Sequence, residues 1–145
     1  MKIPFIHQLS LVTGFVIISV CGQAHAEPLE IQKIMKGLGE DMQKVTDGIS
    51  REDWGLVEVA ALRIADHPRP PLEERQRIMG FIGADAAKFK SNDKKTHETA
   101  RVLAKAAGRE DGQAVIAAFA TLQESCLTCH QNFRQSLQQH FYGQP

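Results

Sequence analysis

The sequence predicts an all-α fold: an antiparallel up-down-up-down four-helix bundle with a short extra helix between helices two and three. From Glu27 onward the chain has no alternating runs of β-branched residues, and it is rich in Ala, Leu, Lys, Glu and Gln, which favour helices. Four amphipathic segments are joined mostly by short connections, so neighbouring helices should run antiparallel around one core. A length of 145 residues suits one domain.

Residues 1–26 are predicted to be a secretory signal peptide, which leaves 27–145 as the domain and places it in the periplasm. Lys2 precedes an apolar run of about 12 residues, and Ala24-His25-Ala26 is a small-x-small cleavage site. An uncleaved membrane anchor is less favoured, because such a run is too short to cross a hydrocarbon core of roughly 30 Å. Lipidation at Cys21 is disfavoured by the bulky Val20 before it. We therefore expect no stable membrane insertion after cleavage.

The first two helices are expected at about 28–46 and from Ser50 to about Asp66. Pro28 suits a first helical turn, and Gly48 with Ser50 marks the break between the two helices. The first helix carries one apolar stripe at three- and four-residue steps, which contains Leu29, Ile31, Ile34, Met35, Leu38, Met42 and Val45.

A corner and two further long helices follow. Three prolines in the segment 67–71 exclude a helix there, and helical periodicity resumes from Leu72 as a short helix that ends near Gly83. A third long helix is expected at about 84–107 and the last at about 111–140, after which the tail from Tyr142 to Pro145 should fray.

The last helix carries the most specific motif, Cys126-Leu127-Thr128-Cys129-His130, a C-x-x-C-H haem-attachment sequence. Two thiols can add to the two vinyl groups of one porphyrin, while the adjacent imidazole reaches the iron. On a helix these three positions are related as i, i+3 and i+4, so they share one face. We therefore expect one covalently bound haem c with His130 as an axial ligand.

Three other interpretations of this motif are weaker. A thioredoxin-type disulfide motif should open a helix within a βαβ pattern, which this chain lacks. A zinc site would need a second Cys pair or a clustered His pair, and none is visible. Two ordinary buried cysteines beside a surface histidine would leave the spacing and the export signal unexplained.

The other side of the iron decides the function, because a Met there gives a six-coordinate electron carrier and an apolar residue leaves room for a gas. In the predicted bundle His130 lies beside the start of the first helix, where Met35 is better placed than Met42, which lies roughly 10 Å further along. Met35 could equally be a plain core methionine. His67 and His97 sit in polar or loop surroundings, where a solvated histidine is commoner than an axial ligand.

Arg134 follows His130 by one helical turn, so it could screen the haem propionates or simply face solvent. The chain has 17 Lys and Arg against 17 Asp and Glu, so no nucleic-acid partner is expected. No distal His-Arg pair suited to peroxide cleavage can be placed, which disfavours an enzyme.

With these features the chain resembles the class II cytochromes c, the cytochrome c′ family, over about 28–140. The segment 34–42 is similar to that family's first-helix segment, with Met35 at the distal position. The resemblance implies the low-spin, Met-ligated branch and a periplasmic one-electron carrier that exchanges electrons with redox partner proteins. The alternative is a five-coordinate, high-spin member that binds nitric oxide or carbon monoxide. Family members are often dimers, so a homodimer stays open.

Two departures from the family limit what the resemblance implies. Ile31 stands where many members carry a basic residue, one turn before the distal position. The segment 72–83 lengthens the usual connection between helices two and three. Contacts to the propionates and the dimer surface therefore do not transfer directly.

Overall fold

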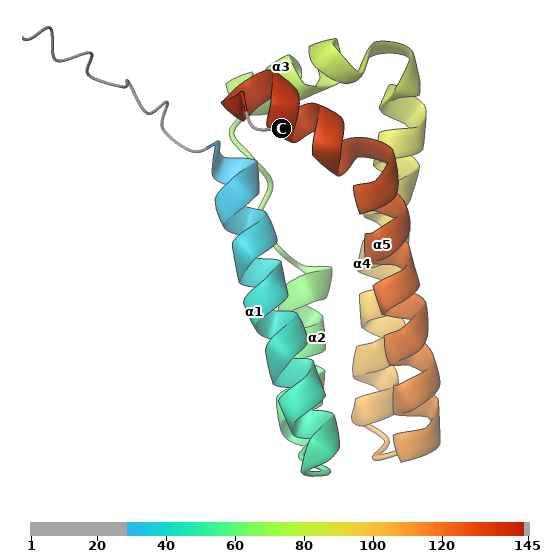
Figure 1. The fold of residues 1–145 in the computed structure, drawn as a ribbon. Coiled ribbons are helices and arrows are strands. Elements are labelled where there is room, and N and C mark those ends of the chain that lie inside the picture. The colour runs from blue at the N-terminus through green and yellow to red at the C-terminus, as the bar shows by residue number, and fades with distance from the viewer. Residues whose placement is uncertain (1–28, 144–145) are drawn as a thin grey trace, which may run out of the picture.

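A computed structural model describes residues 29–143 and confirms the all-α fold (Figure 1). These residues form five α-helices and one turn of 3₁₀-helix: α1 (Glu30–Ser50), α2 (Trp54–Ala65), α3 (Leu72–Ile82), η1 (Gly83–Asp85), α4 (Ala86–Ala107) and α5 (Gly112–Tyr142). The long helices α1, α2, α4 and α5 run alternately in opposite directions. The extra helix α3 lies across one end, where it joins the two halves of the bundle (Figure 1).

The helix starts follow side-chain capping. Asp53 accepts a hydrogen bond from the backbone N–H of Leu56 at 3.0 Å, and Asp111 accepts one from Ala114 at 3.0 Å. Each carboxylate satisfies a backbone donor that the helix itself cannot pair. The expectation that Ser50 begins the second helix is wrong, because Ser50 is the last residue of α1 and its hydroxyl donates to the Thr46 carbonyl at 2.8 Å.

Gly48 lies inside α1 and is buried, although the sequence suggested a break there. A Cβ atom at this position would lie 2.8 Å from Cγ2 of Val57 and 3.1 Å from the carbonyl oxygen of Asp53. The glycine therefore allows the start of α2 to pack directly against α1. Its role is close approach between two helices, not chain reversal.

The core occupies the half of the bundle nearest the α1–α2 and α4–α5 turns. Small side chains dominate it, so the helices there lie close together. Its buried members are Val45, Val57, Ala60, Ala61, Ile64, Ala65, Ala100, Leu103, Ala104, Ala106, Ala107, Val115, Ala118 and Leu122.

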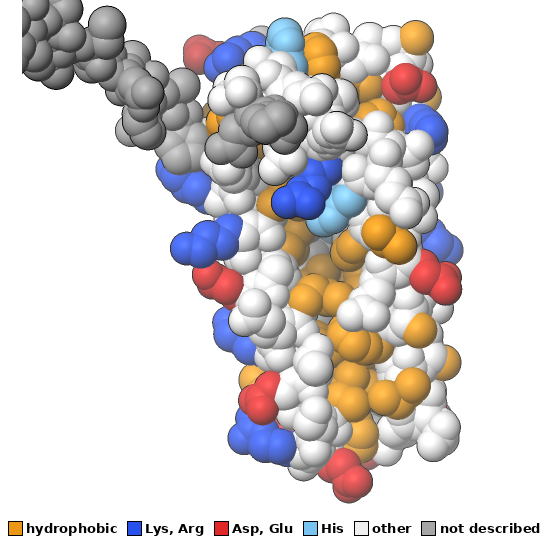
Figure 2. Space-filling model, viewed as in Figure 1, with side chains coloured by type: hydrophobic (Ala, Val, Ile, Leu, Met, Phe, Trp, Pro, Cys, Tyr) orange, Lys and Arg blue, Asp and Glu red, His pale blue; other side chains and the backbone are white. Residues whose placement is uncertain are grey.

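The bundle is open between α1 and α5. α1 packs on α2, α2 on α4 and α4 on α5, whereas α1 and α5 meet only weakly. In Figure 1 these two helices are separated over much of their length, and Figure 2 shows a hollow between them in which hydrophobic side chains are visible.

The open half is covered at its end by α3 and the last turns of α5. The Glu74 carboxylate accepts hydrogen bonds from the backbone N–H groups of Glu30 and Ile31, both at 2.8 Å. The backbone N–H of Leu29 donates to the Tyr142 hydroxyl at 3.2 Å. Tyr142 is thus helical and bonded to the start of α1, so the expectation that it frays is wrong.

The predicted signal peptide, residues 1–26, lies outside the described residues. Within 29–143, none of the helices combines the length and the apolar character needed to cross a membrane.

Candidate functional site

The C-x-x-C-H motif lies within α5, which is continuous from Gly112 to Tyr142. Cys126 and Cys129 are free thiols and half-buried, and Cys126 packs against the core. Helical spacing places both sulfurs and the His130 imidazole on one side of α5. Leu127, between the cysteines, is 57% exposed, so the intervening residues point away.

The surroundings set the protonation states of these three groups. Burial raises the pKa of Cys126, and it raises the pKa of Cys129 to about 11 with added contributions from the Asp93 carboxylate and Cys126. Burial and then the nearby Arg134 cation lower the pKa of His130. At neutral pH the site therefore holds two protonated thiols and a neutral imidazole, the form of His that can bind a metal ion.

Met35 and His130 lie at similar heights in the bundle. A Cβ at Gly112 would lie 3.2 Å from the Trp54 ring, so the start of α5 is level with the α1–α2 turn. From the standard rise of α-helices, Met35 stands roughly 22 Å above the end of α1 and His130 roughly 27 Å above the start of α5. The difference is about one helical turn.

Met35 lies on the side of α1 that faces the bundle interior. Met42 and Ile49 follow it at successive seven-residue steps, and both pack against the core. Met35 itself is 40% exposed. Within residues 29–143 no hydrogen bond, ion pair or ring contact joins Met35 to His130. The two residues thus lie on the two helices that flank the hollow, and none of these interactions connects them.

Arg134 lies one turn beyond His130 on α5 and is exposed. Among the described residues it has no hydrogen-bonded or ion-pair partner, although its charge acts on the His130 imidazole. Next to it in sequence, Phe133 is 7% exposed and packs edge-to-face on Phe89, with 5.2 Å between ring centroids. This stretch of α5 thus offers an unpaired cation beside an aromatic pair.

These residues fit a haem. Two thiols and an imidazole project from one helix face, as the attachment of a single porphyrin requires. The adjacent hollow is lined by hydrophobic side chains, which suit the apolar faces of the ring (Figure 2). Arg134 could pair with a propionate.

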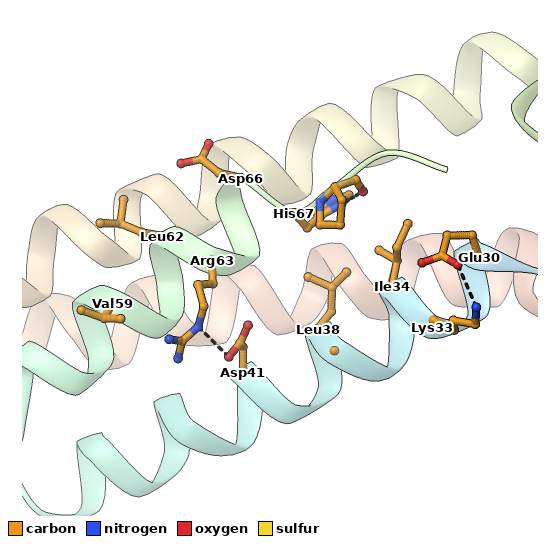
Figure 3. A pocket seen from close by; sticks show the side chains of 12 residues that line it. Glu30, Lys33, Ile34, Leu38, Asp41, Val59, Leu62, Arg63, Asp66 and His67 are labelled. Carbon is orange, nitrogen blue, oxygen red and sulfur yellow. Dashed lines mark hydrogen bonds and ion pairs between the residues drawn. The ribbon is translucent and has the colours of Figure 1, made fainter. Parts of the chain in front are cut away.

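A separate cavity of about 620 Å³ lies between α1 and α2 (Figure 3). Ile34, Leu38 and Val59 line it, and so does the ion pair between Arg63 and Asp41, whose Nε and Oδ1 atoms are 2.9 Å apart. None of Met35, Cys126, Cys129 and His130 is among its lining residues.

His67 and His97 are less exposed than the sequence suggested. Their side chains are 10% and 19% exposed, and their rings stack with 4.5 Å between centroids. Asp93 lies beside both. The i, i+4 spacing of Asp93 and His97 is visible in the sequence, but nothing local marks His67 as their neighbour.

Comparison with known proteins gives one match. The family model described as cytochrome c′ matches residues 71–134, which span α3, α4 and most of α5. The matched region contains the C-x-x-C-H motif and Arg134, and it excludes α1 with Met35. No curated protein and no solved structure matches the chain. The match supports a c-type cytochrome related to this family, with haem c as its cofactor, that acts in electron transfer or gas binding.

Proposed function

We propose that this chain is a periplasmic one-electron carrier with a single covalently bound haem, whose iron is ligated by His130 and Met35. The observation that carries the proposal is the C-x-x-C-H motif itself: it lies within the continuous helix α5, helical spacing puts its two thiols and its imidazole on one side, and Cys126 packs against the core. Met35 supports it from the opposite helix, at about the same height. The match to the cytochrome c′ family supports the cofactor.

Each residue has a distinct part in this proposal. Cys126 and Cys129 form the two thioether bonds, and His130, which is neutral at pH 7, offers a nitrogen lone pair to the iron. When bound, the haem supplies a one-electron couple between ferric and ferrous iron. Met35 offers a thioether sulfur, a ligand that raises the reduction potential. Arg134 compensates the negative charge of a propionate.

Rigid surroundings suit an electron carrier, because little has to move when the iron changes its charge. The small-residue core packs the first part of α5 against α4, which in turn packs against α2. The hollow between α1 and α5 is open to the surface, so a haem held there would be within reach of a redox partner protein.

Gas binding is the second candidate, and the exposure of Met35 favours it. A methionine that is 40% exposed beside an open hollow could pack over the distal face without ligating the iron. Nitric oxide or carbon monoxide would then bind at the vacant position. The two functions differ in one observable, the sixth ligand of the iron.

Absorption spectra of the haem-loaded protein and its methionine variants test this choice. For the electron carrier we expect a low-spin spectrum with a sulfur-to-iron charge-transfer band when oxidised, and no response to carbon monoxide when reduced. Met35→Leu should abolish the band and admit the gas, because it keeps the bulk of the side chain and removes the sulfur. Met42→Leu is the matched control, one heptad further along α1, and should leave the spectrum unchanged.

Other outcomes reassign the function. A high-spin wild-type spectrum that shifts with carbon monoxide identifies the gas binder. Loss of the charge-transfer band in Met42→Leu but not in Met35→Leu would identify Met42 as the iron ligand in place of Met35. Haem that can be extracted with acidified organic solvent from the wild-type protein would contradict covalent attachment through Cys126 and Cys129 and reject the whole proposal.

A further inference from the structure

A second group of potential metal ligands lies on α4 and in the connection after α2, near Cys129 of the C-x-x-C-H motif. His67 follows α2 in the connection to α3, and Asp93 and His97 lie one turn apart on α4. One ligand atom from each residue lies within 4.8 Å of the other two. The His67 Nε2 atom is 3.9 Å from Oδ1 of Asp93, and the His97 Nε2 atom is 3.6 Å from Oδ2.

Backbone carbonyls fix the tautomers of both imidazoles. Nδ1 of His67 is 3.0 Å from the carbonyl oxygen of Pro68, and Nδ1 of His97 is hydrogen-bonded to the carbonyl oxygen of Ala65. A carbonyl oxygen can only accept, so each Nδ1 carries the hydrogen. When the rings are neutral, each keeps its lone pair on Nε2, on the side of Asp93. A backbone carbonyl that orients the far nitrogen is the usual arrangement around metal-bound histidines.

When both rings are neutral, the three groups direct electron pairs toward one another. Among the described residues, Asp93 forms no ion pair with a lysine or an arginine. Arg101, one turn beyond His97 on α4, is paired with Asp66 at 2.7 Å. A cation that lies among the Asp93 carboxylate and the two neutral imidazoles, which are 3.6 and 3.9 Å from it, would be attracted by all three groups.

The dimensions suit a transition-metal ion. Metal-to-nitrogen and metal-to-oxygen bonds of about 2.0–2.2 Å place tetrahedral ligand atoms roughly 3.4 Å apart, so the side chains need to move by about 1 Å or less. The two histidine side chains are mostly buried, while that of Asp93 is 49% exposed. A cation can thus enter from the Asp93 side and keep water as its remaining ligand.

We propose that His67, Asp93 and His97 bind one divalent transition-metal ion of the kind that prefers imidazole, such as Zn²⁺. An Asp and a His at i and i+4 on one helix form the two-point chelate, and His67 adds the third ligand from a separate segment. This site goes beyond the proposed electron transfer and does not depend on how the haem iron is ligated.

Zinc binding to the haem-loaded protein tests the proposal. The protein is first freed of metal with a chelator and then titrated with Zn²⁺ at pH 7.5 in a calorimeter. We expect one ion per chain in the wild type, and an affinity at least about tenfold weaker in His97→Gln and in Asp93→Asn. The control is His140→Gln: His140 is an exposed histidine of α5 that stacks on Phe81, and this variant should bind like the wild type.

Zinc bound with equal affinity by the wild type and all three variants would overturn the proposal, and so would no stoichiometric binding at all. The haem spectrum reports whether each variant is folded. If His97→Gln does not fold, Asp93→Asn decides the outcome, because its side chain is half-exposed and the change keeps its shape.

Discussion

Cys129 shows how a carboxylate on a neighbouring helix acts on one side chain. Burial raises its pKa to about 11, and Asp93 of α4 is the next largest cause. Asp93 is not among the causes of the raised pKa of Cys126, one turn earlier. In the haem-free protein, Asp93 therefore raises the pKa of Cys129 and not that of Cys126, so Cys126 is a matched internal control.

We predict that Asp93→Asn lowers the pKa of Cys129 in the haem-free protein. Removal of the negative charge favours the thiolate, which is the reactive form, so alkylation of Cys129 should begin at a lower pH. Peptide mass spectrometry after iodoacetamide treatment from pH 8 to 11 measures both thiols at once. The pH profile of Cys126 should stay in place; a joint shift of both profiles would point to a change in fold instead.

Residues could be predicted from the sequence where the chemistry is local. The thiols and His130 fall within five consecutive positions, so the helix period alone places them on one face. The place of Met35 is harder to predict, because it depends on how two helices from opposite ends of the chain meet. The contact of His67 with Asp93 could not be foreseen, since it depends on where the connection after α2 turns back toward α4.

At the scale of the helices, the sequence predicted the short extra helix α3 but not its contact with the start of α1. The periodicity from Leu72 indicated α3, whereas the hydrogen bonds from the start of α1 to Glu74 depend on tertiary structure. The exact boundary between α1 and α2 also depends on tertiary structure. Ser50 and Asp53 are both suitable caps, and packing around Gly48 selects the later one.

Two glycines of α1 should respond to alanine in opposite directions. In a helix, Gly→Ala ordinarily stabilises by about 0.5–1 kcal/mol. A Cβ added at Gly37 would meet no other atom within 4 Å, and this residue lines the cavity toward α2, so Gly37→Ala should show that gain. Gly48→Ala should instead destabilise by about 1–3 kcal/mol, because its Cβ would overlap Val57 and the Asp53 backbone.

Urea unfolding of the haem-loaded protein, followed by circular dichroism, measures both changes. A gain in stability for Gly48→Ala would show that α1 and α2 can separate at no cost, contrary to their close contact at this glycine. A loss for Gly37→Ala would mean that the cavity beside it is filled by something a methyl group displaces.

At the scale of the whole molecule, the sequence predicted the order and direction of the helices but not the opening. Short connections and four apolar stripes are enough for an antiparallel bundle. However, an apolar stripe in the sequence does not show which parts of the stripe pack against another helix and which stay exposed. On α1 the same stripe packs Met42 against the core and leaves Met35 40% exposed.

Because the bundle is open between α1 and α5, we predict that haem attachment stabilises the first half of α1 against local unfolding more than any other part of the bundle. α1 has weak contacts with α5, and a porphyrin held near Met35 would supply apolar surface to its first half. Backbone hydrogen exchange should therefore slow in 31–42 when the haem-loaded wild type is compared with a haem-free Cys126→Ala/Cys129→Ala variant.

The lower part of α4, residues 99–107, is the internal reference for that comparison. Its buried members pack against α2 and α5 in the small-residue core, away from the hollow, so its protection should change much less. Equal slowing in both segments would mean that the haem stabilises the bundle globally. Unchanged exchange in 31–42 would mean that the porphyrin lies elsewhere along α5. Met35 would then not be a ligand of the iron.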